Sequence, residues 1–141
     1  MRQMYIALCL IQQNDKYLMQ LRNGDPKIGG AGLVGCFGGK LEPGETSHQA
    51  AHREMGEETS HQPHIHDLTY VGEVNVESDH MLEPVKVCAH VYKVMLDSAV
   101  KLEAAEGKLV QMTLDQVKES FDTLTTGTRA CFETLVFQGS E

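Results

Sequence analysis

Residues 38–61 read GGKLEPGETSHQAAHREMGEETSH, and the rest of the chain is organised around this stretch. Thr46 followed three residues later by Gln49 is the pattern of a helix N-cap with a capping box. It predicts a helix from Ser47 to about Thr59, with Ala50, Ala51 and Met55 at helical spacing on its apolar side. Because residues three and four positions apart are neighbours on a helix, one face would carry three carboxylates, those of Glu54, Glu57 and Glu58.

Three glutamates near the end of a helix reduce its stability. Glu54 and Glu58 form a like-charge pair that costs about 0.2–0.5 kcal/mol, and each carboxylate opposes the helix dipole by about 0.3–1 kcal/mol. Gly56 in the helix interior costs about 1 kcal/mol relative to alanine. This concentration of unfavourable residues indicates a compensating role, and a hard divalent cation is the natural partner of clustered carboxylates. A solvated acidic face is the alternative that the spacing alone leaves open.

A wider pattern favours the metal site. Gly39, Glu45 and the segment 53–58 (REMGEE) are separated by five and seven residues, and together they closely resemble the signature of the Nudix hydrolases. That family has a glycine where this chain has Ser60 and an aliphatic residue where it has His61. We therefore expect the loop that leaves the helix to be distorted or strained, with the carboxylates unaffected.

The Nudix resemblance implies a fold, a cofactor and a role for each matched residue. The fold would be α/β, an α/β/α sandwich with a central mixed β-sheet, and the cofactor would be Mg²⁺, with Mn²⁺ as the alternative. Glu57 and Glu58 would be the principal metal ligands, together with the backbone oxygen of Gly39. Glu54 would be a further ligand or the general base, and Arg53, paired with Glu45, would orient the glutamates. The choice of base between Glu54 and a residue outside the signature stays open.

Glu106 matches a weaker feature of the family. It lies just before an expected strand, where many Nudix members place an additional metal-binding or basic glutamate. The alternative is that Glu106 is simply an acidic loop residue.

The remaining segments predict alternating strands and helices. Strands are expected at 4–11, 16–21, 67–77, 85–96 and 107–112, and the pair at 67–77 and 85–96 predicts an antiparallel hairpin with a turn at 78–84. The glycine-rich loop from Asn23 to Gly39 has room for a short strand around 33–37. Thr113 with Gln116 caps a short helix, and apolar residues between 124 and 136 predict a further helix. Strands interleaved with three helices predict an α/β sandwich, with residues 1–141 as a single domain.

Composition limits the function. The chain has 141 residues, a net charge of −8 and no basic cluster, which argues against extended nucleic-acid binding. It has no apolar run long enough to span a membrane and no signal-peptide pattern, so a cytoplasmic location is expected. Four widely spaced cysteines are expected to be reduced thiols: Cys9, Cys36, Cys88 and Cys131.

Two other patterns suggest different sites. Residues 30–35 (GAGLVG) match a dinucleotide-binding GxGxxG, but such a fingerprint must open a helix, and this one leads into further glycines and Pro43. Histidines could hold a transition metal, either at 61, 64 and 66 or at 48 and 52. The first set has no cysteine partner and the second lacks the adjacent acid of HExxH, so a surface loop and a helix surface are the favoured interpretations.

The substrate prediction is a small nucleotide. Arg22 and Lys40 are the best placed cations for phosphates, and Phe37 is a candidate to stack on a base, with Phe121 or a tyrosine as alternatives. Segments 30–32, 37–40, 44–46 and 114–117 resemble the oxidised-purine nucleoside triphosphatases among the Nudix hydrolases, which implies a nucleoside or deoxynucleoside triphosphate. Those enzymes read the base with an asparagine where this chain has Gly35 and with a tryptophan, which this chain lacks.

Other functions stay open at this point. An ADP-ribose or other nucleoside-diphosphate-X hydrolase is one alternative, and a catalytically silent nucleotide-binding module is the second. The sequence leaves the oligomeric state open, a homodimer included.

Overall fold

A computed structural model describes residues 2–23, 32–78 and 84–139. The strands are β1 (Arg2–Gln13), β2 (Lys16–Leu21), β3 (Val34–Gly35), β4 (Phe37–Lys40), β5 (Thr69–Ser78), β6 (Val85–Leu96) and β7 (Lys108–Met112). The α-helices are α1 (Ser47–Glu58), α2 (Leu114–Glu119) and α3 (Thr126–Cys131). Short turns of 3₁₀ helix lie at Ile65–Asp67, Phe121–Thr123 and Phe137–Gly139, and a π-helical turn at Phe132–Val136.

The described strands form one mixed sheet. Their order is β3-β2-β1-β6-β5, while β4 pairs with β1 and β7 pairs with β2. β1 and β6 run parallel from Arg2 opposite Val85 to Gln13 opposite Leu96, and the other pairs are antiparallel. Neither β1 nor β6 contains a proline or glycine, so nothing interrupts this long ladder. The predicted antiparallel hairpin is present as β5 and β6, although its turn at 79–83 lies outside the described residues.

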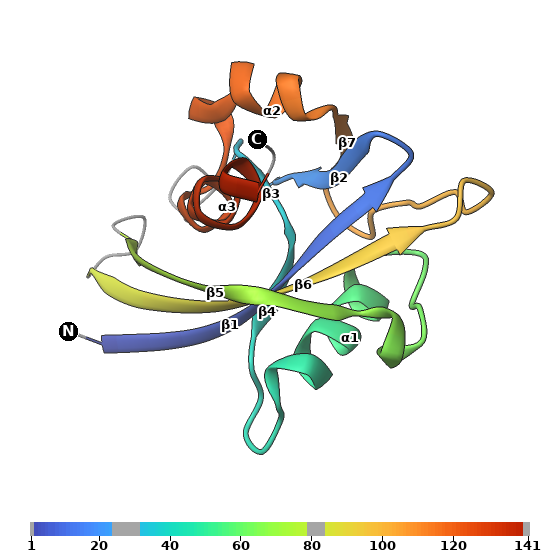
Figure 1. Ribbon diagram of the computed structural model, residues 1–141. Helices are drawn as coiled ribbons and strands as arrows, with labels where there is room; N and C mark the ends of the chain where they lie inside the picture. Colours follow the sequence, from blue (N-terminus) through green and yellow to red (C-terminus); the bar gives the residue numbers. More distant parts are fainter. Residues whose placement is uncertain (1, 24–31, 79–83, 140–141) are drawn as a thin grey trace.

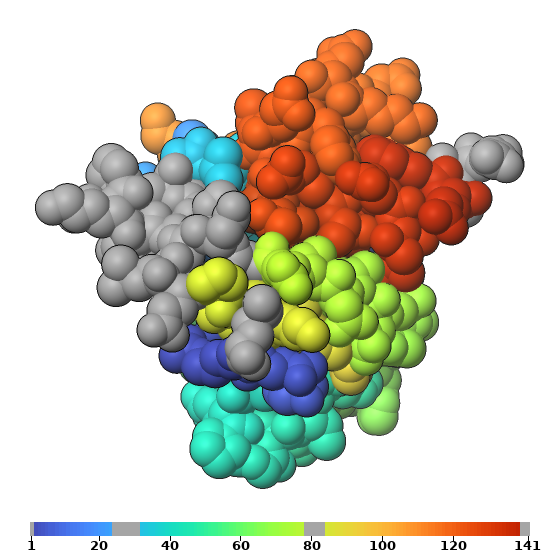
Figure 2. Space-filling model, turned by 90° about the vertical axis from the view of Figure 1, so that its left-hand side faces the viewer, coloured from blue at the N-terminus to red at the C-terminus, as the bar shows by residue number. Residues whose placement is uncertain are grey.

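Helices cover both faces of this sheet. Figure 1 shows α1 on one face and α2 and α3 on the other. Viewed from the side in Figure 2, α1 lies below the ends of β1, β5 and β6, and the C-terminal helices lie above them. Alternate residues of β1 point to opposite faces, so Cys9 packs into the α1 layer and Leu8 into the α3 layer. The predicted α/β/α sandwich with a mixed sheet is confirmed.

Several predicted elements match the structure closely. β2 and β6 have the predicted bounds, α1 begins at Ser47, and the strands expected at 4–11, 67–77 and 107–112 are present with shifted ends. The strand expected around 33–37 is instead two strands, because the chain leaves β3 at Gly35 and begins to pair with β1 only at Phe37. The C-terminal apolar stripe is a short α3 followed by the π-helical turn. All four cysteines are free thiols.

The expected strain at the exit from α1 is absent. Thr59 and Ser60 do not adopt positive φ angles, and Thr59 forms an isolated antiparallel bridge with Ala104. Ser60 donates its backbone N–H to the carbonyl of Glu103 at 2.9 Å, and its Oγ accepts the Glu103 N–H at 2.8 Å. The chain therefore leaves the helix in an extended conformation that pairs with residues 103–105, and this does not require a glycine.

The extent of the domain is not tested by the arrangement of these elements. That residues 1–141 form a single domain stays a prediction. Within the described ranges, no helix has both the length and the apolar composition that crossing a bilayer demands.

Candidate active site

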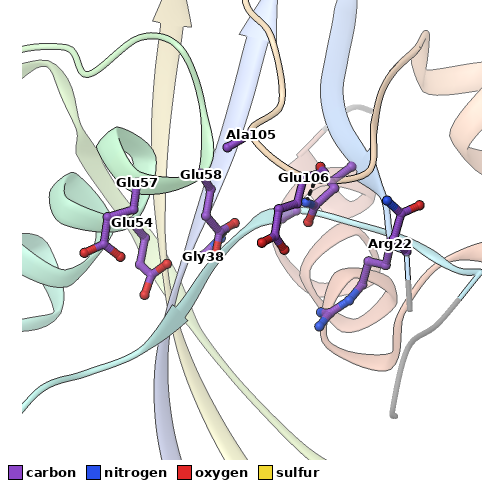
Figure 3. Close-up of a pocket in the computed structure, with 10 residues that line it drawn as sticks. Arg22, Gly38, Glu54, Glu57, Glu58, Ala105 and Glu106 are labelled. Carbon is purple, nitrogen blue, oxygen red and sulfur yellow. Dashed lines mark hydrogen bonds between the residues drawn. The ribbon is translucent and has the colours of Figure 1, made fainter. Parts of the chain in front are cut away.

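The first turn of α1 is held by its cap. Thr46 Oγ1 accepts the Gln49 N–H at 3.1 Å, and Gln49 Oε1 accepts the Thr46 N–H at 2.9 Å, so the capping box is present. Ala50, Ala51 and Met55 are fully buried against the sheet. Burial of this face fixes the rotation of α1 and directs its glutamates to the edge of β4 (Figure 3).

Arg53 connects the acidic residues around α1. Its Nε and Nη2 donate to the two carboxylate oxygens of Glu45 at 2.8 and 3.0 Å. Nη1 donates to Glu54 at 2.9 Å and to Glu57 at 3.0 Å, and Nη2 also donates to the carbonyl of Lys40 at 3.0 Å. All five N–H donors of the guanidinium therefore have an acceptor. This explains how the helix tolerates Glu54 and Glu57, since one cation is shared between them.

Glu58 lies deeper and is not bonded by Arg53. Burial, followed by the neighbouring Glu54 carboxylate, raises the pKa of Glu58 to about 8. The Gly38 N–H, 3.4 Å from Glu58 Oε2, and the positive charge of Arg22 lower this pKa, but by less. Burial and the adjacent carboxylate therefore disfavour the ionised form of Glu58.

A cleft of about 350 Å³ collects these groups. Its described lining residues are Gln20, Arg22, Asn23, Cys36, Gly38, Glu54, Glu57, Glu58, Ala105 and Glu106. In Figure 3 the three α1 glutamates form one side, and Glu106 points into the same part of the cleft as Glu58. In the described structure the three α1 carboxylates do not all lie within 4.8 Å of one another, and Glu54 and Glu57 are both hydrogen-bonded to Arg53.

The glycine turn lets the backbone approach these carboxylates. A Cβ on Gly39 would lie 2.6 Å from Glu54 Oε1, so any side chain there would displace the carboxylate. Gly38 has φ +152°, and a Cβ there would overlap the carbonyl oxygen of Ala7. Position 38 therefore requires glycine, whereas a side chain at position 39 would have to move the Glu54 carboxylate.

The other predicted site residues have mixed locations. Arg22 and Glu106 line the cleft. Lys40 contributes its carbonyl to Arg53, but its side chain lines a separate hollow beside Arg2 and Tyr5. The prediction that Phe37 stacks on a base needs correction, because the ring is fully buried beneath α1. Phe37 pairs with Cys9 of β1, and this register directs its side chain to the core.

Sequence reasoning missed several residues of the cleft. Gln20 donates its side-chain N–H to the carbonyl of Glu106 at 2.8 Å, and Cys36 donates its backbone N–H to Thr128 Oγ1 at 3.0 Å. The available signal was the polar Gln20, which follows the apolar residues 17–19 of β2 and lies two residues before Arg22. Cys36 carried no such signal, because its exposure to the cleft depends on the break between β3 and β4.

The histidines have structural contacts. His48 and His52 place their Nε2 atoms 2.8 and 2.9 Å from the carbonyls of Ile65 and Pro63, which ties α1 to the loop that follows it. The segment 32–35 of the GxGxxG match enters β3 instead of a helix, and its first two residues lie outside the described ranges. The entry into β3 agrees with the rejection of the dinucleotide fingerprint.

The donor set of the cleft fits a hard divalent cation. Glu54, Glu57, Glu58 and Glu106 offer carboxylate oxygens, which are the ligands that Mg²⁺ and Mn²⁺ prefer. Burial and the neighbouring Glu54 carboxylate raise the pKa of Glu58 and so disfavour its ionised form, which a bound cation would stabilise.

Similar structures share this arrangement of elements. The MutT NUDIX hydrolase from Burkholderia pseudomallei gives a TM-score of 0.76 at 23% identity, over 94% of this chain and 98% of that chain. The MutT protein from Methanosarcina mazei Go1 gives 0.74 at 21% identity, over 99% and 97%. A bifunctional NMN adenylyltransferase/ADP ribose pyrophosphatase from Francisella tularensis, complexed with AMP and a Mn ion, gives 0.74 at 22% identity. That match covers 96% of this chain and 41% of the longer one. Because the sequence identities of all three structures are so low, their likeness to this chain shows the fold alone.

Sequence comparison identifies the family. No curated protein gives a significant sequence match. The family profile described as NUDIX domain matches residues 1–132, which includes every element from β1 to α3 and all of the cleft. The chain therefore belongs to the Nudix family.

Proposed function

We propose that this protein is an Mg²⁺-dependent pyrophosphohydrolase that cleaves a nucleoside or deoxynucleoside triphosphate to the monophosphate and pyrophosphate. The observation that carries this proposal is the cleft, with the α1 carboxylates on one side and Glu106, Arg22 and polar side chains on the other. Its volume of about 350 Å³ is within the usual range of small-molecule sites. The phosphates would lie between the carboxylates and Arg22, where bound cations and the guanidinium neutralise their charge.

The glutamates would divide the metal-binding task. Glu57, Glu58, Glu54 and the Gly39 backbone oxygen would hold the cation, with Glu106 as a further ligand from the opposite side. When bound, Mg²⁺ supplies the charge neutralisation that phosphoryl transfer requires. Arg53 would hold Glu54 and Glu57 in orientation through its five hydrogen bonds.

The attacking water needs a proton acceptor. Glu54 Oε1 is already bonded by Arg53, so Oε2 is the atom of Glu54 that would take the proton. Glu106 is the other candidate, because its carboxylate points into the cleft from outside the signature (Figure 3).

The base would be recognised by polar contacts. Among the described residues that line the cleft, none is aromatic, whereas Gln20 and Asn23 offer side-chain amides. Phe121 packs against Phe137 and belongs to the core cluster on the α3 side. These positions favour hydrogen bonding to the base over stacking and give no support to a preference for oxidised purines.

An ADP-ribose or other nucleoside-diphosphate-X hydrolase is the second candidate. The structure of the bifunctional NMN adenylyltransferase/ADP ribose pyrophosphatase from Francisella tularensis, complexed with AMP and a Mn ion, favours it. Divalent-ion chemistry at a diphosphate is common to both candidates, so the shape of the polar end of the cleft would decide between them.

Product analysis separates these functions. The purified chain is incubated with a panel of nucleoside triphosphates, ADP-ribose and other nucleoside diphosphate derivatives, each with Mg²⁺ and with Mn²⁺. Monophosphate plus pyrophosphate supports the first proposal, and AMP plus a sugar phosphate supports the second. Nucleotide binding without metal-dependent turnover across the panel would contradict both and favour a silent nucleotide-binding module.

A further inference from the structure

A second group of metal-ligating side chains lies outside the cleft, on β5 and β6. Glu73, Cys88 and His90 each direct one ligand atom to a common point, and these atoms lie within 4.8 Å of one another. The strand register causes this, since Glu73 is directly opposite His90 and Cys88 is two residues before His90 on the same face of β6. These three residues are called the β5–β6 cluster below.

The cluster is separate from the cleft. It faces the start of α1, where Ser47 Oγ lies 3.0 Å from His90 Nδ1. Glu54 and Glu58 follow Ser47 by seven and eleven residues, which corresponds to about 10–16 Å along a helix. No residue of the β5–β6 cluster is among the described residues that line the cleft.

Neighbouring side chains hold the ligands in place. His90 Nε2 faces Glu73 Oε1 at 2.9 Å, and its other ring nitrogen faces Ser47, whose Oγ is 2.7 Å from the Tyr92 hydroxyl. Asn75 holds the second carboxylate oxygen of Glu73 at 3.1 Å. Metal-binding histidines and carboxylates are usually oriented in this way, through the atom that does not bind the metal.

The exposure of the three residues leaves an entry path. Cys88 is 5% exposed, whereas the side chains of His90 and Glu73 are 33% and 46% exposed. The thiol therefore forms the inner wall, and solvent reaches the cluster from the side of the carboxylate. A fourth coordination position would remain for water.

We propose that the β5–β6 cluster binds a transition-metal ion of the Zn²⁺ class through Cys88 Sγ, His90 Nε2 and a Glu73 carboxylate oxygen. Thiolate, imidazole and carboxylate are the ligands of tetrahedral Zn²⁺ sites, and three protein ligands leave one open position. The all-oxygen donors of the cleft prefer Mg²⁺ or Mn²⁺, so the two sites select different metals. If the cluster binds no metal, it is only a hydrogen-bonded chain that runs through Glu73, His90, Ser47 and Tyr92.

Cobalt(II) distinguishes these arrangements, because a thiolate ligand produces a near-ultraviolet charge-transfer band that carboxylates alone do not. Co²⁺ is titrated into the intact chain in excess Mg²⁺, which occupies the carboxylates of the cleft. We expect the band to saturate at one equivalent of Co²⁺, and one equivalent of Zn²⁺ to abolish it.

Matched variants locate the ligands. Cys88→Ser should lose the band, while Cys36→Ser, which changes a cysteine of the cleft lining, should keep it. Ser47→Ala, which leaves all three ligands intact, should weaken Co²⁺ binding about 10–100-fold. Circular dichroism and thermal melting of each variant confirm that it is folded.

Two results would overturn the proposal. One is the absence of a charge-transfer band in the wild-type chain at saturating Co²⁺. The other is a band that persists in folded Cys88→Ser. If Cys88→Ser does not fold, His90→Gln takes its place, and an unchanged Co²⁺ affinity in that variant has the same meaning.

Discussion

Arg53 is the residue that joins the acidic groups of the cleft to the glycine turn, since its donors reach Glu45, Glu54, Glu57 and the carbonyl of Lys40. Arg53→Lys keeps the charge but has three donors instead of five, so the glutamates would lose their common orientation. We expect kcat to fall about 100-fold, because small displacements of catalytic groups have effects of this size. Steady-state kinetics checks this, with the exposed Arg2→Lys as the control. Equal kcat for Arg53→Lys and wild type would contradict the positioning role.

Glu57 and Glu58 are the principal metal ligands of the proposed mechanism. Glu57→Gln and Glu58→Gln should each lower kcat by roughly 10²–10³-fold, because each removes a charged oxygen that is proposed to hold the cation. The free energy of unfolding in metal-free buffer should be unchanged or higher for Glu58→Gln, since the buried Glu58 carboxylate is crowded by Glu54. Urea titration and turnover assays measure both quantities. Wild-type turnover in both variants would refute the proposed metal site.

Glu45 makes stability depend on acid pH. Its hydrogen bonds with Arg53 hold the pKa of Glu45 below its ordinary value of 4.5. A carboxyl group whose pKa is lowered by folding stabilises the folded protein fully at pH values above its unfolded-state pKa. This contribution is lost as the pH falls through the lower pKa of the folded state. Glu45→Gln should therefore unfold more easily than wild type at pH 7, and the difference should disappear in acid.

Urea denaturation across the acid range tests this, with a matched control nearby. Glu42 lies 3.7 Å from the same guanidinium but its side chain is 63% exposed, so Glu42→Gln should behave like wild type. An equal effect of both substitutions would mean that the hydrogen bonds of Glu45 are not the cause.

At the scale of elements, the exit from α1 contradicts the expectation from the family pattern. Ser60 is extended and hydrogen-bonds with Glu103 on both its backbone and its side chain, so glycine offers no conformational advantage there. Ser60→Gly should lower the free energy of unfolding by about 1–2 kcal/mol, through a more flexible unfolded chain and one lost hydrogen bond. Ser60→Ala, which loses only the hydrogen bond, should lose about 1 kcal/mol. A more stable Ser60→Gly would mean that the loop is strained after all.

At the scale of the molecule, the core is apolar on both faces of the sheet. Two apolar clusters fill the layers on either side of the sheet, and the carboxylates lie at the edge of one of them. Chelation should therefore abolish turnover and leave the circular dichroism spectrum unchanged. Mg²⁺ at 100 times its Kd should stabilise the protein by about 2.7 kcal/mol, which thermal melting detects as a higher Tm.

Two variants locate that stabilisation. Glu58→Gln should lose most of the Mg²⁺-dependent rise in Tm. Glu73→Gln, which changes the β5–β6 cluster, should keep it. A rise in Tm that depends on Glu73 and not on Glu58 would place the Mg²⁺ site outside the cleft.

The sequence was sufficient for features that depend on neighbours along the chain. The capping box of Thr46 and Gln49, the apolar spacing of α1 and the bounds of β2 and β6 all follow from interactions within a few residues. The signature from Gly39 to Glu58 was sufficient to predict the family, because its spacing encodes a glycine turn followed by a helix.

Features that depend on distant contacts required the three-dimensional structure. The burial of Phe37 follows from its register with Cys9, and the place of Gln20 in the cleft depends on Glu106, 86 residues later. The β5–β6 cluster likewise depends on which residues of two strands face each other. A local pattern determines which element forms and which of its residues share a face, whereas burial and convergence depend on the register between strands and on the packing of helices against them.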